Sequence, residues 1–334
     1  MLPVAVDVMG GDKGPAEIVA GARRAAEELG VPVLLVGQPE AIGDAGGLEI
    51  LAAAEVIGMT DDPAQGVRRK KDASVVRAAE AVRDGRASAM VSAGNTGGAM
   101  ASALLRMGRI SRVQRPAIAS VLPVPGSTPT ILLDAGANTD CNPAMLVQFA
   151  QMGAVYAAAR WHLAEPRVAL LSNGEEDTKG NNLVKEAHGL LAAPGCLRGP
   201  GTFIGNVEGR DLLSDRVDVV ACDGFTGNVV LKALEGGLRF LVDSFLGAMT
   251  STPEGQKATE TILPLIMPLH AELDPDSYGG AMLLGIDGVC IISHGSSSAR
   301  AIFNAVGLAR EMVDAEMVGR LLDAVAPSKE PAAG

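Results

Sequence analysis

Residues 217–228 read VDVVACDGFTGN, a mainly β-branched apolar run that passes directly into a loop of Asp, Gly, Thr and Asn. An amphipathic stretch follows at once, which is the pattern of a strand, a tight turn and a helix. The same pattern opens the chain, where residues 4–15 read VAVDVMGGDKGP. Four further junctions follow apolar runs at residues 89–92, 130–133, 168–171 and 289–293. The chain is therefore predicted to repeat strand, loop and helix.

The apolar runs are continuous rather than alternating, as expected of strands that helices cover on both faces. Helical segments between such strands imply right-handed crossovers and a parallel sheet. The predicted fold class is α/β, with a doubly wound, mainly parallel, Rossmann-like sheet in three layers. In such a sheet the strand-to-helix loops emerge at one edge, where helix N-terminal amides attract anions. We therefore expect the six loops to converge on one anion site.

Composition limits the class of protein. The 334 residues, 48% of them hydrophobic, can bury a full core, and we expect one catalytic α/β unit at residues 1–326 and a flexible tail at 327–334. The apolar stretch at residues 262–269 is too short to span a membrane, and Pro264 and Pro268 interrupt it. Four widely spaced cysteines and no secretory leader favour free thiols, no zinc site and a cytoplasmic location.

Charge is unevenly distributed along the chain. The net charge of −11 argues against a nucleic-acid partner, because phosphate backbones are bound through basic surfaces. Residues 66–115 nevertheless hold eleven Lys and Arg against three acids, a net charge of +8. This basic segment could steer an acidic partner or a phosphate, or it could be a solvated or intersubunit-paired face.

The loop at residues 223–232 combines two glycines, possible helix caps in Thr226 or Asn228, and a lysine, which suits an anion. Ordinary capping would explain the same residues. His294 follows the last predicted strand and is expected to point into the same cleft, although local hydrogen bonds could also explain it. The acids at residues 173–181 could hold a metal or cap a helix, and we predict no metal and no cofactor. The sequence contains no dinucleotide-binding, Walker, esterase or zincin motif.

At these loops the sequence closely resembles the bacterial acyl-carrier-protein:phosphate acyltransferase family of phospholipid synthesis, over almost the whole chain. The matching motifs are residues 6–12 (VDVMGGD), 69–74 (RKKDAS), 92–97 (SAGNTG), 115–117 (RPA), 133–138 (LDAGAN), 174–181 (GEEDTKGN), 205–211 (GNVEGRD), 223–232 (DGFTGNVVLK), 278–281 (YGGA) and 294–297 (HGSS). So many motifs in the same order make chance an implausible explanation.

The resemblance implies transfer of a fatty acyl group from an acyl-carrier-protein thioester to inorganic phosphate. The product, acyl-phosphate, would serve a downstream membrane glycerol-3-phosphate acyltransferase in phosphatidic acid and phospholipid synthesis. The resemblance also implies a fold of the isopropylmalate-dehydrogenase-like superfamily, a homodimer, and a projecting helical arm at about residues 233–275. It places the protein in the cytoplasm, with weak peripheral contact at the inner face of the cell membrane.

Site residues follow from the matched motifs. We assign the phosphate to the loops at residues 94–98, 136–138 and 223–228, with Lys179 or Lys232 neutralising its charge, and the thioester carbonyl oxygen to His294 and Asn228. The remaining residues expected to bind substrate are Asp7, Gly10, Gly11, Asp12, Gly94, Asn95, Thr96, Gly97, Asp134, Gly136, Asn138, Gly174, Glu175, Glu176, Asn181, Asp223, Gly224, Thr226, Gly227, Gly295, Ser296 and Ser297.

Two surfaces complete the expectations. A stripe of apolar residues at helical spacing runs from Leu234 to Met249 and could bind the acyl chain or pack in the core or a dimer. Residues 250–276 carry five acids and one lysine, so membrane contact would rest on the apolar side chains of residues 262–269. Arg106, Arg109, Arg112 and Arg115 are expected to dock the acidic carrier protein.

Two other functions fit the same loops. A phosphate acetyltransferase-like enzyme would use acyl-coenzyme A with a similar phosphate pocket. A non-catalytic phosphate or metabolite sensor would bind without turnover.

Overall fold

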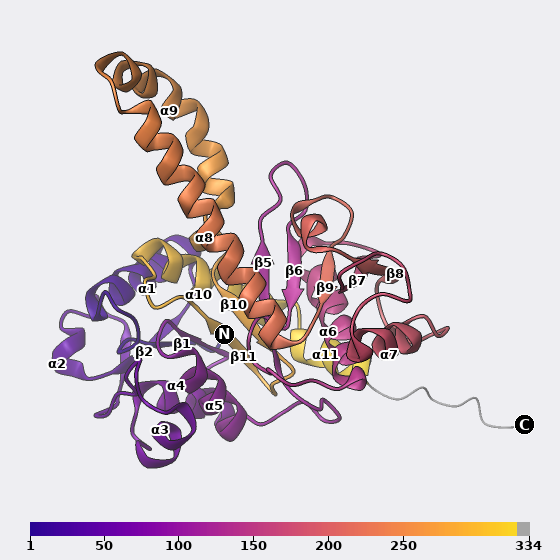
Figure 1. Cartoon of the computed structure of the whole chain (residues 1–334). Helices are drawn as coiled ribbons and strands as arrows, with labels where there is room; N and C mark the ends of the chain where they lie inside the picture. The colour runs from indigo at the N-terminus through magenta and orange to yellow at the C-terminus, as the bar shows by residue number, and fades with distance from the viewer. Residues whose placement is uncertain (326–334) are drawn as a thin grey trace, which may run out of the picture.

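The computed structural model describes residues 1–325 and has a single eleven-stranded sheet at its centre (Figure 1). The strands are β1 (Val4–Asp7), β2 (Val33–Gly37), β3 (Glu49–Ala52), β4 (Ala89–Ser92), β5 (Ala117–Leu122), β6 (Thr130–Leu133), β7 (Arg167–Leu171), β8 (Thr202–Val207), β9 (Val219–Ala221), β10 (Ala281–Leu284) and β11 (Val289–Ile292). They lie in the order β3-β2-β1-β4-β11-β10-β5-β6-β9-β7-β8. The six strands expected from the sequence junctions, β1, β4, β6, β7, β9 and β11, are confirmed.

Helices cover both faces of this sheet. They are α1 (Pro15–Leu29), α2 (Pro39–Ile42), α3 (Pro63–Arg69), α4 (Ser74–Arg83), α5 (Thr96–Arg106), α6 (Pro143–Trp161), α7 (Asn182–Leu191), α8 (Gly224–Met249), α9 (Pro253–Leu273), α10 (Ala299–Asp314) and α11 (Met317–Val325), with short 3₁₀ turns η1 (Gly209–Leu213) and η2 (Pro275–Tyr278). In the half of the sheet that contains β1, β2 and β4, helices α1 and α10 cover one face while α4 and α5 cover the other (Figure 1). The predicted three-layer α/β class is therefore confirmed.

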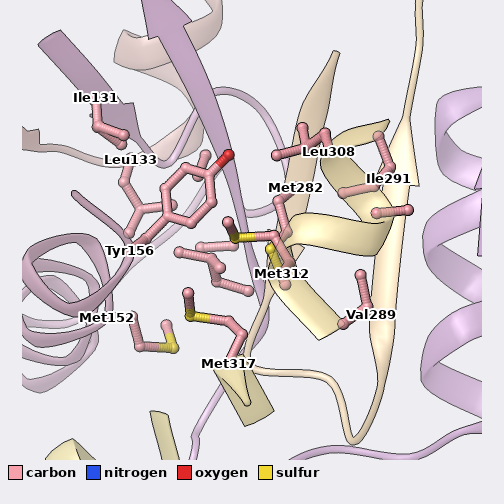
Figure 2. Packing of buried hydrophobic residues seen from close by; sticks show 14 of the residues in the cluster. Ile131, Leu133, Met152, Tyr156, Met282, Val289, Ile291, Leu308, Met312 and Met317 are labelled. Atoms are coloured by element: carbon pink, nitrogen blue, oxygen red, sulfur yellow. The ribbon is translucent and has the colours of Figure 1, made fainter. Parts of the chain in front are cut away.

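Neighbouring residues of one strand serve different cores, which explains the continuous apolar runs. Val4 and Val6 face the cluster beneath α1, α6 and α10, whereas Ala5 between them faces the cluster beneath α4 and α5. Figure 2 shows the first cluster, with Tyr156 of α6 beside Leu133 of β6. Both faces of the inner strands are thus buried, so alternation with polar residues is absent there, whereas the edge strands β3 and β8 are partly exposed.

Strand direction does not follow the prediction. Seven strand pairs are parallel, but β10 pairs antiparallel with both β11 and β5, and β5 pairs antiparallel with β6. These three reversals make β6, β9 and β7 run opposite to β1, β4 and β11. The expectation that all six loops emerge at one edge is therefore wrong. The loops after β1, β4 and β11 emerge at one edge of the sheet, and the loops after β6, β9 and β7 emerge at the opposite edge.

The predicted arm is present as the helical pair α8 and α9, which projects away from the body of the molecule (Figure 1). Helix α8 begins at the end of β9, where Val230, Leu231 and Leu234 pack against the core. Helix α9 returns and leads through η2 into β10. Pro264 and Pro268 do not break α9, which continues through both positions.

The apolar stripe of α8 is divided between the body and the arm. Leu234 packs against the core, so the core interpretation holds at the base of the helix. Beyond it, Leu241, Phe245 and Leu246 expose 54%, 63% and 40% of their surface. This outer part of the stripe stays largely exposed although α9 packs beside α8.

Residues 326–334 lie outside the described part of the chain, and with them the predicted unit boundary at 326 and the predicted flexible tail. All four cysteines are free thiols, as expected. Of the helices that the structure describes up to residue 325, none combines the length and apolar content needed to cross a membrane.

Candidate active site

The loops after β1, β4 and β11 are packed directly against one another and form what we call the first-edge loops. A Cβ placed on Gly10 would lie 2.5 Å from the backbone nitrogen of Gly94, so the two loops touch through their main chains. The backbone N–H of Asp12 donates to the carbonyl of Gly295 at 2.7 Å. Glycine is required here because any side chain would separate the loops.

Asp7 stands beneath these loops rather than at their surface. Its buried carboxylate accepts from Ser92 Oγ at 2.7 Å and from the Met9 backbone N–H at 3.2 Å. Burial raises the pKa of Asp7 above its ordinary value, and these hydrogen bonds oppose that shift. These bonds let Asp7 position the loops, and direct contact of its side chain with substrate stays a prediction.

Asn95 is the N-cap of α5 and cross-links two segments. Its Oδ1 accepts from the Gly98 N–H at 3.0 Å, and its Nδ2 donates to the carbonyls of Gly58 at 3.2 Å and Met59 at 3.1 Å. These bonds use both ends of the amide, so capping explains this residue. Thr96 and Gly97 form the first turn of α5, whose N-terminal amides favour anions.

His294 is exposed at the start of the loop after β11. Its Nδ1 lies 2.8 Å from Ser296 Oγ, and its carbonyl accepts from the Ser297 N–H at 3.0 Å. In the same loop the hydroxyls of Ser293 and Ser297 are buried, at 4% and 5% exposure, and have no hydrogen-bond partner among the described residues. Buried hydroxyls are normally paired, so these two are available to a ligand.

The loops after β6, β9 and β7 form the second-edge loops, and Asp134 organises the first of them. Its carboxylate accepts five hydrogen bonds: from the backbone N–H groups of Ile118, Gly136, Ala137 and Asn138 and from the side-chain amide of Asn138, at 2.7–3.2 Å. Burial raises its pKa, against the effect of these donors. Asp134 thus positions this loop, and its predicted role as a substrate ligand stays a prediction.

The start of α8 packs onto this loop. Asp223 caps the helix by accepting from the N–H and hydroxyl of Thr226 at 2.8 and 2.7 Å, and Gly224 N–H donates to the Asn138 carbonyl at 2.7 Å. The N-cap of α8 is therefore Asp223, whereas the expected caps, Thr226 and Asn228, lie within the helix. Asn228 lies exposed one turn further, with its Nδ2 about 2.8 Å from where a Cβ of Gly136 would be.

The third second-edge loop is held by arginines that sequence reasoning missed. Arg216 donates to Glu175 and to Asp211, each at 3.0 Å, and lowers the pKa of Glu175. Asn181 caps α7, and the Glu176 carbonyl accepts from Asn206. Lys179 is exposed beside Gly174. Among residues 1–325 no group of three or more possible metal ligands is found.

The two lysine candidates occupy different environments. Lys232 lies two turns into α8 and donates to Glu235 at 2.8 Å, so its charge is already partly neutralised. Lys179 has no described ion pair in the part of the chain that the structure covers. The missed residues Ser92, Ser293, Asn206 and Arg216 each stand in or beside a quoted motif, but only tertiary contacts distinguish them from ordinary polar residues.

Comparison with known proteins identifies the family. Residues 2–320 match the family model described as "Fatty acid synthesis protein". A phosphate acyltransferase of Heliobacterium modesticaldum is 47% identical, covering 98% of this chain and 99% of that protein. A phosphate acyltransferase of Pelotomaculum thermopropionicum is 48% identical, covering 98% and 95%.

Solved structures share the fold at low identity. A branched-chain phosphotransacylase from Enterococcus faecalis matches with a TM-score of 0.60 and 16% identity, covering 94% of this chain and 99% of that chain. A phosphotransacetylase from Streptococcus pyogenes gives the same TM-score and identity and covers 94% of each chain. From the full-length matches of its sequence, this chain belongs to the fatty acid synthesis protein family, together with the phosphate acyltransferases it resembles.

Proposed function

We propose that the protein is a phosphate acyltransferase, which moves a fatty acyl group from an acyl-carrier-protein thioester to inorganic phosphate. Full-length relatives at 47% and 48% identity bear that name. The acyl-phosphate product would supply a membrane glycerol-3-phosphate acyltransferase for phosphatidic acid synthesis.

The observation that carries the phosphate site is the pair of unpartnered buried hydroxyls, Ser293 and Ser297, on either side of exposed His294. A phosphate has several acceptor oxygens and would pair both hydroxyls. The first turns of α5 and α10 begin beside the same loops and add the positive ends of two helix dipoles. We place the phosphate at the first-edge loops.

The chemistry needs no protein nucleophile. A phosphate oxygen attacks the thioester carbonyl carbon, the new C–O bond forms, and the C–S bond breaks as the electron pair leaves on sulfur as thiolate, which water protonates. Burial raises the pKa of Cys141 to about 11 and of Cys290 to about 12, and also raises the pKa of Cys196 and Cys222. Thiols that remain protonated do not accept an acyl group readily, which favours direct transfer.

His294 is suited to stabilise the carbonyl oxygen as it becomes negative, by donating from its ring. Asn228 and Lys179 belong to the second-edge loops, which follow strands of opposite direction. Because four-residue strands are about 13 Å long, the two groups of loops suit different ends of one long substrate. We propose that Asn228 and Lys179 hold the carrier's prosthetic arm, away from the thioester end that lies beside His294.

The acidic carrier protein would dock on basic side chains. Two of the four arginines predicted for this task are already engaged: Arg106 pairs with Glu80 at 3.5 Å, and Arg109 donates to the carbonyls of Val113 and Gln114. Arg112 and Arg115 are exposed and have no ion pair among the described residues. We therefore assign docking to Arg112 and Arg115.

The arm would serve two contacts. A second copy of the chain would cover the outer stripe of α8, where Leu241 and Phe245 are 54% and 63% exposed. Weak, reversible contact with the inner face of the cell membrane would rest on apolar side chains of α9, of which Leu265 is 78% exposed. Anionic lipid would oppose it through the nearby acids.

The test is incubation of the purified protein with a long-chain acyl-carrier protein, with and without inorganic phosphate. Free thiol and acyl-phosphate are both measured. Phosphate-dependent appearance of both supports the proposal. Thiol release without phosphate means a thioesterase, turnover with acyl-coenzyme A alone means a different acyl donor, and phosphate binding without turnover means a sensor.

A further inference from the structure

The short turn η2 lies between the arm and the loop that carries His294. On the arm side, Ser277 Oγ donates to the Ala271 carbonyl at 2.6 Å, and the Tyr278 hydroxyl donates to the Glu272 carbonyl at 2.9 Å. Both carbonyls belong to the last turn of α9, where helix geometry leaves such groups unpaired. The turn is therefore fastened to the returning helix of the arm.

On the other side, η2 is fastened to the start of α10. Ser298 Oγ donates to Asp276 Oδ2 at 2.9 Å, and Asn304 Nδ2 donates to the Asp276 carbonyl at 2.7 Å. Ser298 is also the N-cap of α10, because its Oγ accepts from the Ala301 N–H. The Asp276 carboxylate thus holds the residue at which the His294 loop ends.

The exit from η2 touches the beginning of the same loop. Gly280 has φ +94°, and a Cβ placed on it would lie 2.7 Å from the Ile292 carbonyl and 3.0 Å from Ser293 Oγ. The next residue, Ala281, pairs with Ile292 in the sheet. Residues 293–298 are therefore bounded at both ends by the segment that leaves the arm.

We propose that Asp276 is a positioning residue for the His294 loop and that η2 couples the arm to this loop. The inference rests on the proposed function of the loop. Within residues 293–298, His294 is exposed, and the hydroxyls of Ser293 and Ser297 have no hydrogen-bond partner among the described residues. The positions of these three side chains therefore depend on how the two ends of the loop are held. A displacement of α9, such as one caused by contact of the arm with a lipid surface, would move η2 and, through the Asp276 hydrogen bond, Ser298.

The test compares Asp276→Ala, Ser298→Ala, the double variant and the conservative Asp276→Asn. Removal of a hydrogen bond to a charged group is expected to lower kcat and kcat/KM together by roughly tenfold, with the KM for acyl thioester unchanged. Ser298→Ala removes the bond to Asp276 and also the N-cap of α10, so the double variant should be no worse than Ser298→Ala alone. Asp276→Asn keeps an acceptor and should recover most of the rate.

Thr252→Ala is the matched control. Thr252 caps α9 at the far end of the arm, accepting from the Gly255 N–H at 3.1 Å, so it removes a cap without touching the His294 loop. Hydrogen exchange of residues 293–298 is followed in every variant. Asp276→Ala and Ser298→Ala should accelerate it several-fold, and Thr252→Ala should not.

Equal exchange and equal kcat in Asp276→Ala and the wild type would overturn the inference, as would an equal effect of Thr252→Ala or strict additivity in the double variant. If the wild type shows no phosphate-dependent turnover, the proposed function fails instead. The exchange measurement still decides in that case, because it requires no activity. A wild-type exchange rate in Asp276→Ala would again reject the coupling.

Discussion

Gly227 of α8 packs so closely on Asp134 that a Cβ at position 227 would overlap the Asp134 carbonyl oxygen. Both groups are backbone, and neither can move without disturbing the loop after β6 or the first turn of α8. The start of α8 can approach the loop after β6 this closely only because residue 227 has no side chain. This contact explains why the first turn of α8 contains a glycine at position 227, although glycine is a poor helix former.

Gly227→Ala is expected to destabilise the protein by about 3 kcal/mol or more, because overpacking here is against backbone. The measurement is the free energy of unfolding in urea. Gly236→Ala, on the same helix with nothing near its Cβ position, should stabilise by up to about 1 kcal/mol. Equal stability of the two variants would contradict the packing described.

Asp7 predicts a specific pH dependence. Burial raises its folded-state pKa above the unfolded value of about 3.9, so protonation favours the folded state. This contribution is fully present below the unfolded pKa and is lost as pH rises through the folded-state pKa. Asp7→Asn keeps an acceptor for Ser92. The free energy of unfolding of Asp7→Asn, relative to that of the wild type, should therefore be lowest at acidic pH and should rise as pH rises. Unfolding curves from pH 4 to 8 measure the difference.

Substitutions at the two edges should affect different substrates. His294→Ala is expected to lower kcat by roughly 10²-fold, as loss of one oxyanion donor does. Asn228→Ala and Lys179→Ala should raise the KM for acyl-carrier protein about tenfold and leave the KM for phosphate nearly unchanged. Steady-state kinetics with each substrate varied in turn distinguish the two patterns. Unchanged turnover in all three variants would remove these roles.

Dimerisation through the arm predicts a change of mass. Replacing Leu241 and Phe245 by Ser takes two exposed apolar side chains from the outer stripe of α8. The variant should be monomeric at micromolar concentration in light scattering, while the wild type is dimeric. Leu105→Ser, which removes an exposed apolar residue of α5 instead, is the control and should leave the mass unchanged.

Membrane contact is tested by flotation with vesicles. Leu265→Glu should abolish flotation with neutral vesicles, because it places a charge among apolar side chains of α9. Vesicles rich in anionic lipid should bind the wild type less well than neutral ones at low salt, since residues 250–276 are acidic. Stronger binding to anionic vesicles would contradict the proposed contact.

Sequence patterns identified the local units well. The run before Asp223 became β9 and the stretch after it became α8, because apolar β-branched residues, glycine turns and caps act within a few residues. Capping was an alternative for the loops at residues 173–181 and 223–232, and the structure shows caps at Asn181 and at Asp223, although Asp223 was not one of the expected caps. The full-length motifs were sufficient for the family.

Strand direction could not be read in the same way. Nothing in residues 117–133 or 281–292 specifies locally that β5, β6, β10 and β11 pair antiparallel, because pairing depends on contacts between segments far apart in the chain. Those pairings separate the loops into two groups. The burial of Asp7 and Asp134, and the hydrogen bonds that each accepts, likewise depend on contacts between distant segments.

The sequence by itself determined the strand–loop–helix units, the helix caps, the arm and the family, since each depends on local patterns or on motifs preserved in order. Only the tertiary structure decided which loops meet, which carboxylates are consumed in holding them, and that η2 joins the arm to the His294 loop. Those outcomes depend on burial and hydrogen bonding between distant segments, which no local pattern encodes.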